Sequence, residues 1–558
     1  MTLRESLSYL PVELTFGTSG LRGLVRDITH LEAYLNARAF LRYAIETGRV
    51  RPGDAVALAG DLRPSTLERV AAEGGRGEIL QAVARATEDS GLRTAYLGRI
   101  PTPALMHFAL SRRLASVMIT GSHIPFDRNG IKFNLPTGEV LKSDEAAILE
   151  AVRRVRAEEY GRAAADSPFD AQGMLKPGSV RALPAPDPVG EEEYTARYLR
   201  AFPRGVLAGR RILVYEHSAV GRDLLVKVLR ELGAEVIPAG RSEQFIPIDT
   251  EAVSDRMLAD IQALVEGNGG AAIDAVVSTD GDSDRPLVLG VDDGRVRFFG
   301  GDLLGLVVAD FVGARQVAVP ISANDAVDRF GAARGMTVTK TRIGSPYVVA
   351  AMREVGWEAN GGFLTAAPLR VPGGGELSAL PTRDALLPVL AALYSSLGQG
   401  MTVSERFARL PARFGRSDLI RPFSRETSLR IIARFTPSET TIQEVRFGKG
   451  EVKVRAWDGV ETTHPMADPK VAELEARRDD LEAFFTAKDG FESVEWMNFI
   501  DGVRVGFSNG DVAHLRPSGN APELRMYACA DTQVRADAIA RLGVAEDGIL
   551  RRITAALT

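Results

Sequence analysis

The chain has 558 residues and a formal net charge of −5, with 45% hydrophobic residues, 25% charged residues and a single cysteine, Cys529. These values describe a globular protein that is too long for one hydrophobic core, and they exclude an internal disulfide framework or a thiolate metal cluster, because both require several cysteines. Since positive and negative charges nearly balance, the chain lacks the positive electrostatic potential that binds a polyanionic backbone, and no nucleic-acid partner is expected.

Short β-branched runs alternate with longer segments of helical period along most of the chain. This pattern predicts α/β units with a mostly parallel sheet. A helix is expected over 143–160, where Ser-Asp-Glu would supply an N-terminal cap and Ile148 and Val152 line one face. Buried strands, each followed by a polar loop, are predicted at 55–59, 117–119, 212–215, 275–278 and 317–321.

The Pro-rich stretch 182–188 stiffens the chain and removes amide donors, so it is predicted to be a linker. A second α/β unit follows, with a helix near 224–232, and a third begins near Val317. The last segment changes character, because 440–456 and 502–506 have the pattern of antiparallel strands. We therefore expect four domains, with the boundaries 1–185, 186–312, 313–415 and 416–558.

The two longest apolar stretches, 303–312 and 385–394, are too short for a membrane span, which needs roughly 20 residues. The first residues, Met-Thr-Leu-Arg-Glu-Ser, do not resemble an export signal, because they lack an apolar segment. A cytoplasmic protein without a membrane partner is expected.

The stretch Thr-Gly-Ser-His-Ile-Pro-Phe-Asp-Arg-Asn-Gly-Ile-Lys, at 120–132, follows a predicted strand. A serine hydroxyl such as that of Ser122 is a poor nucleophile without help, and His123 or Lys132 could supply proton transfer or positive charge. A turn in which Thr120 and Ser122 only bond backbone amides explains this stretch alone equally well. No Gly-x-Ser-x-Gly elbow surrounds Ser122, so a serine hydrolase is not indicated.

The stretch Asp-Gly-Asp-Ser-Asp-Arg, at 280–285, also follows a predicted strand. In an extended backbone alternate residues project to the same side, so Asp280, Asp282 and Asp284 would converge. Three anions so close repel one another unless a cation lies among them, and oxygen ligands suit a hard ion such as Mg²⁺. An EF-hand is excluded, because its loop needs Gly where this chain has Arg285. An Asp-rich turn that only caps a strand is common for one or two aspartates, but not for three in alternation.

Two further stretches are rich in hydrogen-bond donors. Leu-Arg-Pro-Ser-Gly-Asn, at 515–520, could envelop a phosphate dianion, although an ordinary Pro/Gly turn explains it as well. Phe-Gly-Thr-Ser-Gly-Leu-Arg-Gly, at 16–23, is weak evidence by itself. A glycine-rich stretch at 267–272 loosely matches a dinucleotide fingerprint, but it is predicted to follow a helix and precede a strand, the reverse of the required order. Nucleotide binding is therefore not indicated.

Together, the stretches at 16–23, 120–132, 280–285 and 515–520 resemble the α-D-phosphohexomutase superfamily, which includes phosphomannomutases and phosphoglucomutases. The four stretches are spread over nearly the whole chain and occur in the same order as in that superfamily. It implies three related α/β domains with mixed sheets, and a smaller C-terminal α+β domain, around a central active-site cleft. The four predicted domains would then carry, in chain order, the phosphoserine loop, the metal loop, the sugar-recognition loop and the phosphate-binding loop.

The resemblance also implies a role for individual residues, with the serine of the second stretch phosphorylated in the active enzyme. The implied catalytic residues are Ser122, His123, Lys132, Arg22 and Arg285. The implied Mg²⁺ ligands are Asp280, Asp282, Asp284 and Ser122. The implied ligands of the substrate phosphate are Arg516, Ser518, Gly519 and Asn520. Asn520 replaces the usual Thr and keeps a hydrogen-bonding side chain, whereas the usual Glu after it is absent.

The sequence departs from the family in the third domain. The family's sugar-reading loop runs Gly-Glu-x-Ser-Gly, whereas this chain has Asn-Gly-Gly-Phe-Leu-Thr-Ala at 360–366, with Phe363 where the Glu is expected. Phe cannot accept a hydrogen bond from a sugar hydroxyl. Thr365 can still bond, and neighbouring Glu358 or Asn360 could substitute. Asn360 and Thr365 are therefore the expected sugar-binding residues.

The implied reaction interconverts hexose 1-phosphate and hexose 6-phosphate through a phosphoserine enzyme and a hexose bisphosphate intermediate. Mannose is the first choice of sugar, Mg²⁺ the expected cofactor and hexose 1,6-bisphosphate the expected activator. A phosphoglucomutase or phosphoglucosamine mutase is the alternative. A non-catalytic sugar-phosphate sensor is the alternative of another class, against which the intact serine and aspartate stretches argue. Small hexose phosphates are the expected partners, and the expected oligomeric state is a monomer or homodimer.

Overall fold

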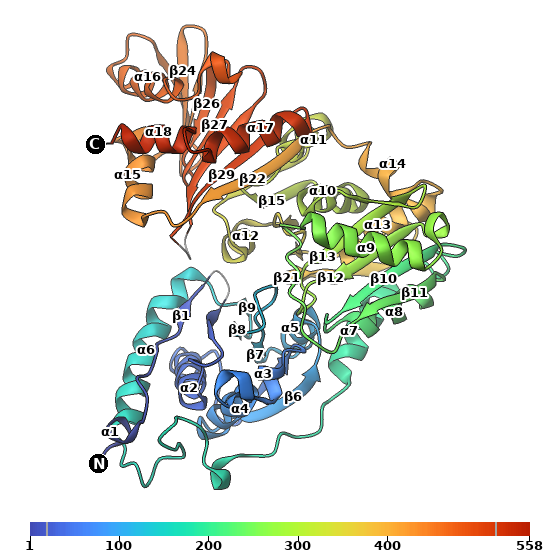
Figure 1. Ribbon diagram of the computed structural model, residues 1–558, viewed down its shortest axis with the longest axis vertical. Coiled ribbons are helices and arrows are strands. Elements are labelled where there is room, and N and C mark those ends of the chain that lie inside the picture. The colour runs from blue at the N-terminus through green and yellow to red at the C-terminus, as the bar shows by residue number, and fades with distance from the viewer. Residues whose placement is uncertain (18–19, 519–521, 558) are drawn as a thin grey trace. The chain divides into compact units, whose positions relative to one another are not determined.

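The structure, a computed structural model (Figure 1), describes three stretches of the chain, 1–17, 20–518 and 522–557. These residues form two compact units. The larger comprises Met1–Ala318 and Gly344–Arg409, and the smaller comprises Val319–Ile343 and the described residues from Leu410 onward. Mixed sheets with helices in the larger unit, and an antiparallel sheet with helices in the smaller one, confirm the predicted fold class. The four domain boundaries stay predictions.

The first sheet of the larger unit has the strand order β1-β2-β8-β7-β3-β6, with β9 paired to β8. Its strands are β1 (Thr15–Phe16), β2 (Leu21–Leu24), β3 (Ala55–Gly60), β6 (Arg93–Arg99), β7 (Ala115–Ile119), β8 (Arg128–Leu135) and β9 (Gly138–Glu139). β3 runs parallel to β6 and β7, whereas β8 is antiparallel to β7 and β2. The predicted strands at 55–59 and 117–119 are confirmed.

Alternate residues of the central strands pack against helices. Val56, Leu58 and Val117 share one core with α2 (His30–Glu46), α4 (Ile79–Asp89) and α6 (Lys142–Gly161), as expected where successive side chains of a strand point to opposite faces. The helix predicted over 143–160 is α6. The predicted Ser-Asp-Glu stretch does supply its cap, because the Asp144 carboxylate accepts the Leu141 amide at 2.9 Å.

The second sheet of the larger unit has the order β11-β10-β12-β13-β14. Its strands are β10 (Arg211–His217), β11 (Glu235–Arg241), β12 (Ala275–Thr279), β13 (Pro286–Asp292) and β14 (Arg295–Phe298). β10, β11 and β12 are parallel, and β13 returns antiparallel to β12. The helices α8 (Arg222–Glu231) and α9 (Asp255–Gly267) belong to this part. The turn between β12 and β13 therefore holds all three aspartates of 280–285. The glycine-rich stretch at 267–272 does follow a helix and precede a strand.

The rest of the larger unit carries β17 (Val355–Trp357), β18 (Phe363–Thr365) and β21 (Leu380–Asp384). β17 pairs with β15 (Gln316–Pro320), and the boundary between the two units falls within β15. Its other helices are α1 (Leu3–Ser6), α3 (Pro64–Leu67), α5 (Thr102–Arg112), α7 (Val189–Ala201), α10 (Gly301–Val312), α12 (Ser345–Ala351), α13 (Leu386–Ser395) and α14 (Val403–Phe407). The apolar stretches 303–312 and 385–394 form α10 and α13. Among the described residues, no helix has the length and apolar character that a membrane crossing needs.

The smaller unit is built on an antiparallel sheet of order β22-β29-β28-β27-β26-β23-β24-β25. Its strands are β22 (Phe414–Ile420), β23 (Ile442–Phe447), β24 (Glu451–Ala456), β25 (Glu461–Pro465), β26 (Val494–Asn498), β27 (Val503–Phe507), β28 (Val512–Pro517) and β29 (Leu524–Ala530). Its helices are α11 (Ala326–Arg334), α15 (Arg425–Phe435), α16 (Pro469–Glu482), α17 (Gln533–Val544) and α18 (Ile549–Ala555). The antiparallel strands predicted in 440–456 and 502–506 are confirmed as β23, β24 and β27.

A buried histidine at the start of α2 makes the stability of the larger unit sensitive to acid. His30 is 0% exposed; its Nδ1 accepts the Leu175 amide at 3.1 Å, so its Nε2 carries the hydrogen donated to the Gly77 carbonyl at 2.9 Å. Burial lowers the pKa of His30 from 6.5 to about 4. Between these values the unfolded chain binds a proton that the folded chain does not, so stability is lost as pH falls through this window.

We expect this histidine to cost about 2 kcal/mol of unfolding free energy between pH 7 and pH 5. Urea denaturation at the two pH values, on the wild type and on His30→Gln, measures it. The variant should be less stable at pH 7 and lose less on acidification. An unchanged difference between the two pH values would contradict the assignment.

Candidate active site

Ser122 lies in the turn after β7, where its backbone adopts a left-handed φ of 56°. Such a conformation costs a non-glycine residue about 1–3 kcal/mol and persists only where its surroundings impose it. The Ser122 amide donates to Thr120 Oγ1 at 2.8 Å, and the Ser122 hydroxyl donates to Asp280 Oδ2 at 2.6 Å. Residues that are 158 positions apart in sequence therefore meet in one buried site.

The three aspartates of the β12–β13 turn form the centre of this site. Asp280, Asp282 and Asp284 are at most 1% exposed, and each offers an oxygen within 4.8 Å of the others. Asp280 Oδ1 accepts the amides of Asp284 and Arg285, both at 3.2 Å. Asp282 Oδ1 and Asp284 Oδ1 are buried and find no hydrogen-bond partner within 1–17, 20–518 and 522–557. Carboxylate oxygens left in this way fit a hard cation, so the trio could hold a metal ion.

Buried cations face the same aspartates. Lys132 Nζ donates to Asp282 Oδ2 at 2.6 Å and to Asp284 Oδ2 at 3.0 Å. Asp284 Oδ2 also accepts Arg383 Nε at 3.1 Å and Nη2 at 3.0 Å, which leaves Asp284 Oδ1 facing Arg285 Nε at 3.7 Å. One oxygen of Asp284 is thus held by cations, while the other stays available to a ligand.

The crowding of charges shifts the pKa values of the trio in opposite directions. Burial, then repulsion from Asp282 and Asp284, raises the pKa of Asp280 well above its usual range. Burial also acts to raise the pKa of Asp282, but the Lys132 charge and hydrogen bond outweigh it, so the net pKa is lowered. For Asp284, burial is outweighed above all by Arg383, and its pKa is lowered too. Without a metal, the ionised form is therefore disfavoured at Asp280 and favoured at Asp282 and Asp284.

The remaining residues predicted as catalytic lie around this centre. Arg22 is on β2, whose register pairs it with Gly130 of β8, and burial and then Arg285 lower its pKa to about 10. His123 Nδ1 lies 3.4 Å from Ser122 Oγ. Burial, followed by the charge of Arg285, strongly lowers the pKa of His123, so its imidazole is neutral at pH 7.

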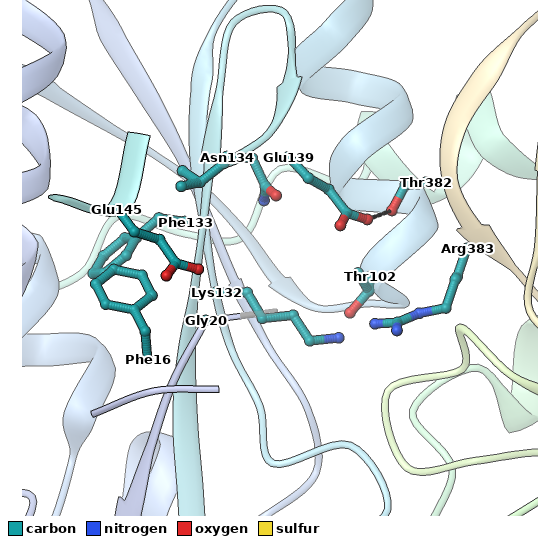
Figure 2. A pocket seen from close by; sticks show the side chains of 11 residues that line it. Phe16, Gly20, Thr102, Lys132, Phe133, Asn134, Glu139, Glu145, Thr382 and Arg383 are labelled. Atoms are coloured by element: carbon teal, nitrogen blue, oxygen red, sulfur yellow. Dashed lines mark hydrogen bonds between the residues drawn. The ribbon is translucent and has the colours of Figure 1, made fainter. Parts of the chain in front are cut away.

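A pocket opens beside this centre, and Figure 2 shows Lys132, Thr102 and Arg383 converging at its polar end. Thr102, at the start of α5, donates its hydroxyl to Asp282 Oδ2 at 2.6 Å. Beside these residues, Glu139 accepts the Thr382 hydroxyl at 2.8 Å. No motif of the sequence pointed to Thr102, Arg383 or Glu139, because each of them gains its place here only through partners that are distant along the chain.

The sugar-reading loop differs from its predicted register. Phe363 is 0% exposed and stacks on Trp357, with ring centroids 5.9 Å apart, so it belongs to the core of the β17–β18 hairpin. Placing it at the position of the family's Glu was therefore wrong. Glu358, at the end of β17, instead accepts Arg383 Nη1 at 2.9 Å. The stretch Glu358-Ala-Asn360-Gly then follows the Glu-x-Ser-Gly pattern, with Asn in place of Ser.

The two residues predicted to bind sugar are placed differently. Thr365 is 2% exposed, and its hydroxyl accepts the Leu380 amide at 2.7 Å and faces the Leu380 carbonyl at 3.5 Å. The Thr365 hydroxyl is thus engaged within the sheet, and its sugar-binding role stays a prediction. Asn360 lies in the β17–β18 turn; its carbonyl accepts the Thr250 hydroxyl at 2.8 Å and its Oδ1 accepts the Gly362 amide at 3.0 Å. Asn360 therefore stays a candidate, beside Glu358.

The predicted phosphate-binding loop belongs to the smaller unit, at the end of β28. Arg516 Nε lies 3.1 Å from Asp501 Oδ2, and the Ser518 amide donates to the Glu523 carbonyl at 2.9 Å. Asp501 Oδ2 also accepts the Ile343 amide at 3.1 Å. Gly519 and Asn520 lie outside the described residues.

Comparisons with known proteins cover nearly the whole chain. Three segments match family profiles described as phosphoglucomutase/phosphomannomutase α/β/α domain I, α/β/α domain III and C-terminal domain, over residues 13–159, 300–414 and 460–542. The chain is 37% identical over 541 residues to a phosphomannomutase from Sinorhizobium fredii, with 95% of this chain and 98% of the relative covered. It is 36% identical over 534 residues to a phosphomannomutase from Salmonella muenchen, with 93% and 92% covered. A phosphoglucomutase/phosphomannomutase family protein from Burkholderia thailandensis, 18% identical, superposes with a TM-score of 0.62 over 97% of both chains, which indicates a shared fold.

Proposed function

The chain belongs to the phosphoglucomutase/phosphomannomutase family, and we propose that it is a phosphomannomutase that works through a phosphorylated Ser122. The observation that carries this proposal is the 2.6 Å hydrogen bond from the Ser122 hydroxyl to Asp280. It puts a potential phosphoryl carrier against a carboxylate cage, where charge compensation can act on a transferring phosphoryl group. Mannose is the proposed sugar because the two relatives described above carry the name phosphomannomutase.

The proposed reaction has two half-reactions. In the first, the bond between phosphorus and Ser122 Oγ breaks as a free hydroxyl oxygen of the hexose monophosphate bonds to phosphorus, which gives hexose 1,6-bisphosphate and an unmodified serine. In the second, the reoriented bisphosphate returns its other phosphoryl group to Ser122 Oγ. The hydroxyl proton of the sugar passes through His123 to Ser122 Oγ in the first step, and the Ser122 hydroxyl proton passes back through His123 to the product oxygen in the second. His123 is proposed for this role because its Nδ1 lies 3.4 Å from Ser122 Oγ, within reach of the oxygen that gains and loses the proton.

Several charged residues would act on the transferring phosphoryl group. Lys132, Arg22 and Arg285 are proposed to balance its charge, because the first and last of these side chains lie buried beside the trio. Mg²⁺ is the proposed cofactor, held by Ser122 and the three aspartates Asp280, Asp282 and Asp284. When bound, it would supply charge compensation for the phosphoryl oxygens.

Sugar and phosphate recognition would fall to two loops. Glu358 and Asn360 are proposed to read the sugar hydroxyls, because a carboxylate and an amide can accept and donate hydrogen bonds there. The substrate phosphate is proposed to bind Arg516, Ser518, Gly519 and Asn520 of the smaller unit. Hexose 1,6-bisphosphate would then act as activator by restoring the phosphate on Ser122.

A coupled assay with mannose, glucose and glucosamine 1-phosphates, in Mg²⁺ and a trace of the matching bisphosphate, tests the proposal. We expect kcat/KM to be highest for mannose 1-phosphate, by about 10-fold or more, since one hydroxyl hydrogen bond is worth at least that much. A preference for glucose or glucosamine 1-phosphate would instead identify the chain as a phosphoglucomutase or a phosphoglucosamine mutase. If no sugar phosphate is interconverted and all are still bound, the sensor alternative gains.

A further inference from the structure

A single buried arginine holds the backbone of the phosphoserine loop, defined here as residues 121–128. Arg63 directly precedes α3, and its side chain is 0% exposed. Four of its hydrogen bonds go to backbone carbonyls of this one loop, those of Ser122 at 3.0 Å, Ile124 at 2.5 Å, Pro125 at 2.7 Å and Arg128 at 3.0 Å. The planar guanidinium fork has the donors for such a set, whereas a lysine ammonium has only three.

The same arginine is tied to the other side of the serine through a carboxylate. Arg63 Nε lies 3.3 Å from Asp61 Oδ2, and that oxygen also accepts the Thr120 hydroxyl at 2.7 Å. Thr120 Oγ1 in turn accepts the Ser122 amide at 2.8 Å. The amide and the carbonyl of Ser122 are therefore both fixed by one buried Asp61–Arg63 pair.

This fixation coincides with backbone strain and close packing. Ser122 is the loop residue with the left-handed φ of 56°, a conformation that the surroundings must impose. At Gly121, a Cβ atom would lie 2.7 Å from the Arg63 Cζ atom. Only glycine allows the guanidinium to approach so closely, so the loop sequence and the arginine are matched.

Phe245, in the segment after β11, covers the arginine. Its ring centroid lies 3.9 Å from Arg63 Cζ, a cation–π contact. The same ring packs against the aspartate turn, because a Cβ on Gly281 would lie 2.8 Å from Phe245 Cζ and 2.6 Å from the Ser122 carbonyl oxygen. Phe245 thus contacts both Arg63, which holds the phosphoserine loop, and the turn that carries the aspartates.

We propose that Arg63 and Phe245 are positioning residues for phosphoryl transfer. Arg63 fixes the loop so that the Ser122 oxygen stays against Asp280, and Phe245 keeps the loop and the aspartate turn in register. The inference rests on the proposed function. A misplacement of about 1 Å in reacting groups can cost about 10²-fold in rate, whereas substrate binding by Glu358 and Asn360 does not depend on these contacts.

Arg63→Lys and Phe245→Leu test this inference with mild changes that keep the charge or the apolar cover. We expect each to lower kcat about 10- to 100-fold, with KM changed less than about 2-fold because the sugar contacts are intact. Arg413→Lys is the matched control. Arg413 is equally buried in the smaller unit and bonds Asp325 at 2.7 and 2.8 Å, Asp531 at 2.8 Å and the Gly510 carbonyl at 2.8 Å. Its variant should lose thermal stability but keep kcat.

Amide hydrogen exchange supplies a readout that needs no turnover. In both test variants, the protection of backbone amides should fall in 121–130 and stay unchanged in the β23–β24 hairpin. In Arg413→Lys, amide protection should stay unchanged in 121–130 and fall only in the smaller unit. If amide protection were lost throughout the larger unit, or if KM, kcat and Tm all fell together, Arg63 would have only a structural role. If the wild type lacks mutase activity, the proposed function fails, yet the exchange result still decides whether Arg63 holds the loop.

Discussion

Replacing Ser122 by alanine is expected to abolish mutase turnover, with kcat falling by about 10⁴-fold or more, because the phosphoryl carrier itself is removed. A coupled assay with saturating bisphosphate measures the loss. Intact-mass analysis should find one phosphoryl group on the wild type after incubation with bisphosphate, and none on the variant.

Ser116→Ala provides the control for this prediction. Ser116 is a buried serine of β7, 0% exposed, whose hydroxyl contacts Met106 and accepts from Asn134. Its loss should lower stability modestly and leave phosphorylation intact. If Ser122→Ala kept more than about a hundredth of wild-type kcat, a fall of under about 3 kcal/mol in transition-state stabilisation, the serine would not be the carrier.

Mg²⁺ is expected to stabilise the protein against heat, and more strongly at higher pH. Asp280 has a raised pKa, through burial and then Asp282 and Asp284. Above the ordinary pKa of 3.8, the metal-free folded protein binds more protons than the unfolded chain, so its stability falls as pH rises toward the folded pKa. The lowered pKa values of Asp282 and Asp284 act below 3.8, outside the range tested. A bound cation would remove the penalty at Asp280.

Thermal melts at pH 5.5 and 8, in chelator and in one fixed Mg²⁺ concentration of about 100 times the Kd at pH 8, measure this effect. We expect about 2.7 kcal/mol of stabilisation at pH 8 and less at pH 5.5. Asp280→Asn should keep the metal-free Tm or raise it, because Asn removes the cost of ionising a third buried carboxyl beside Asp282 and Asp284, and should lose most of the response to Mg²⁺. Asp54→Asn, which alters a surface turn where Asp54 accepts the Arg51 amide, should respond like the wild type. An Mg²⁺ shift that survives in Asp280→Asn would place the cation elsewhere.

The parts of the site that the sequence predicted are those that sit on consecutive positions after a strand. Ser122 and the three aspartates Asp280, Asp282 and Asp284 could be found because a strand end exposes whatever follows it, and the same pattern carried the family resemblance that the comparisons confirm. Their meeting could be expected only through that resemblance, since periodicity contains no information on contacts between distant segments.

The parts that the sequence did not predict are single residues brought in by tertiary structure. Arg383, Thr102 and Arg63 belong to no motif, and their importance follows from burial and from partners far along the chain. The misplaced register at Phe363 has a different cause. A glycine pair before an aromatic residue looked like the recognition loop, whereas the stacking on Trp357 shows that the aromatic residue is core.

The strand that carries Arg383 is fastened on both sides of that residue. Asp384, 2% exposed, accepts hydrogen bonds from the Tyr194 and Tyr198 hydroxyls of α7, while the Thr382 hydroxyl is tied to Glu139. A strand that is held at positions so close together cannot shift to fit a bulkier or epimeric sugar ring. A new sugar preference would therefore have to come from substituting individual side chains of this strand, since changing the length or flexibility of nearby loops would not move it.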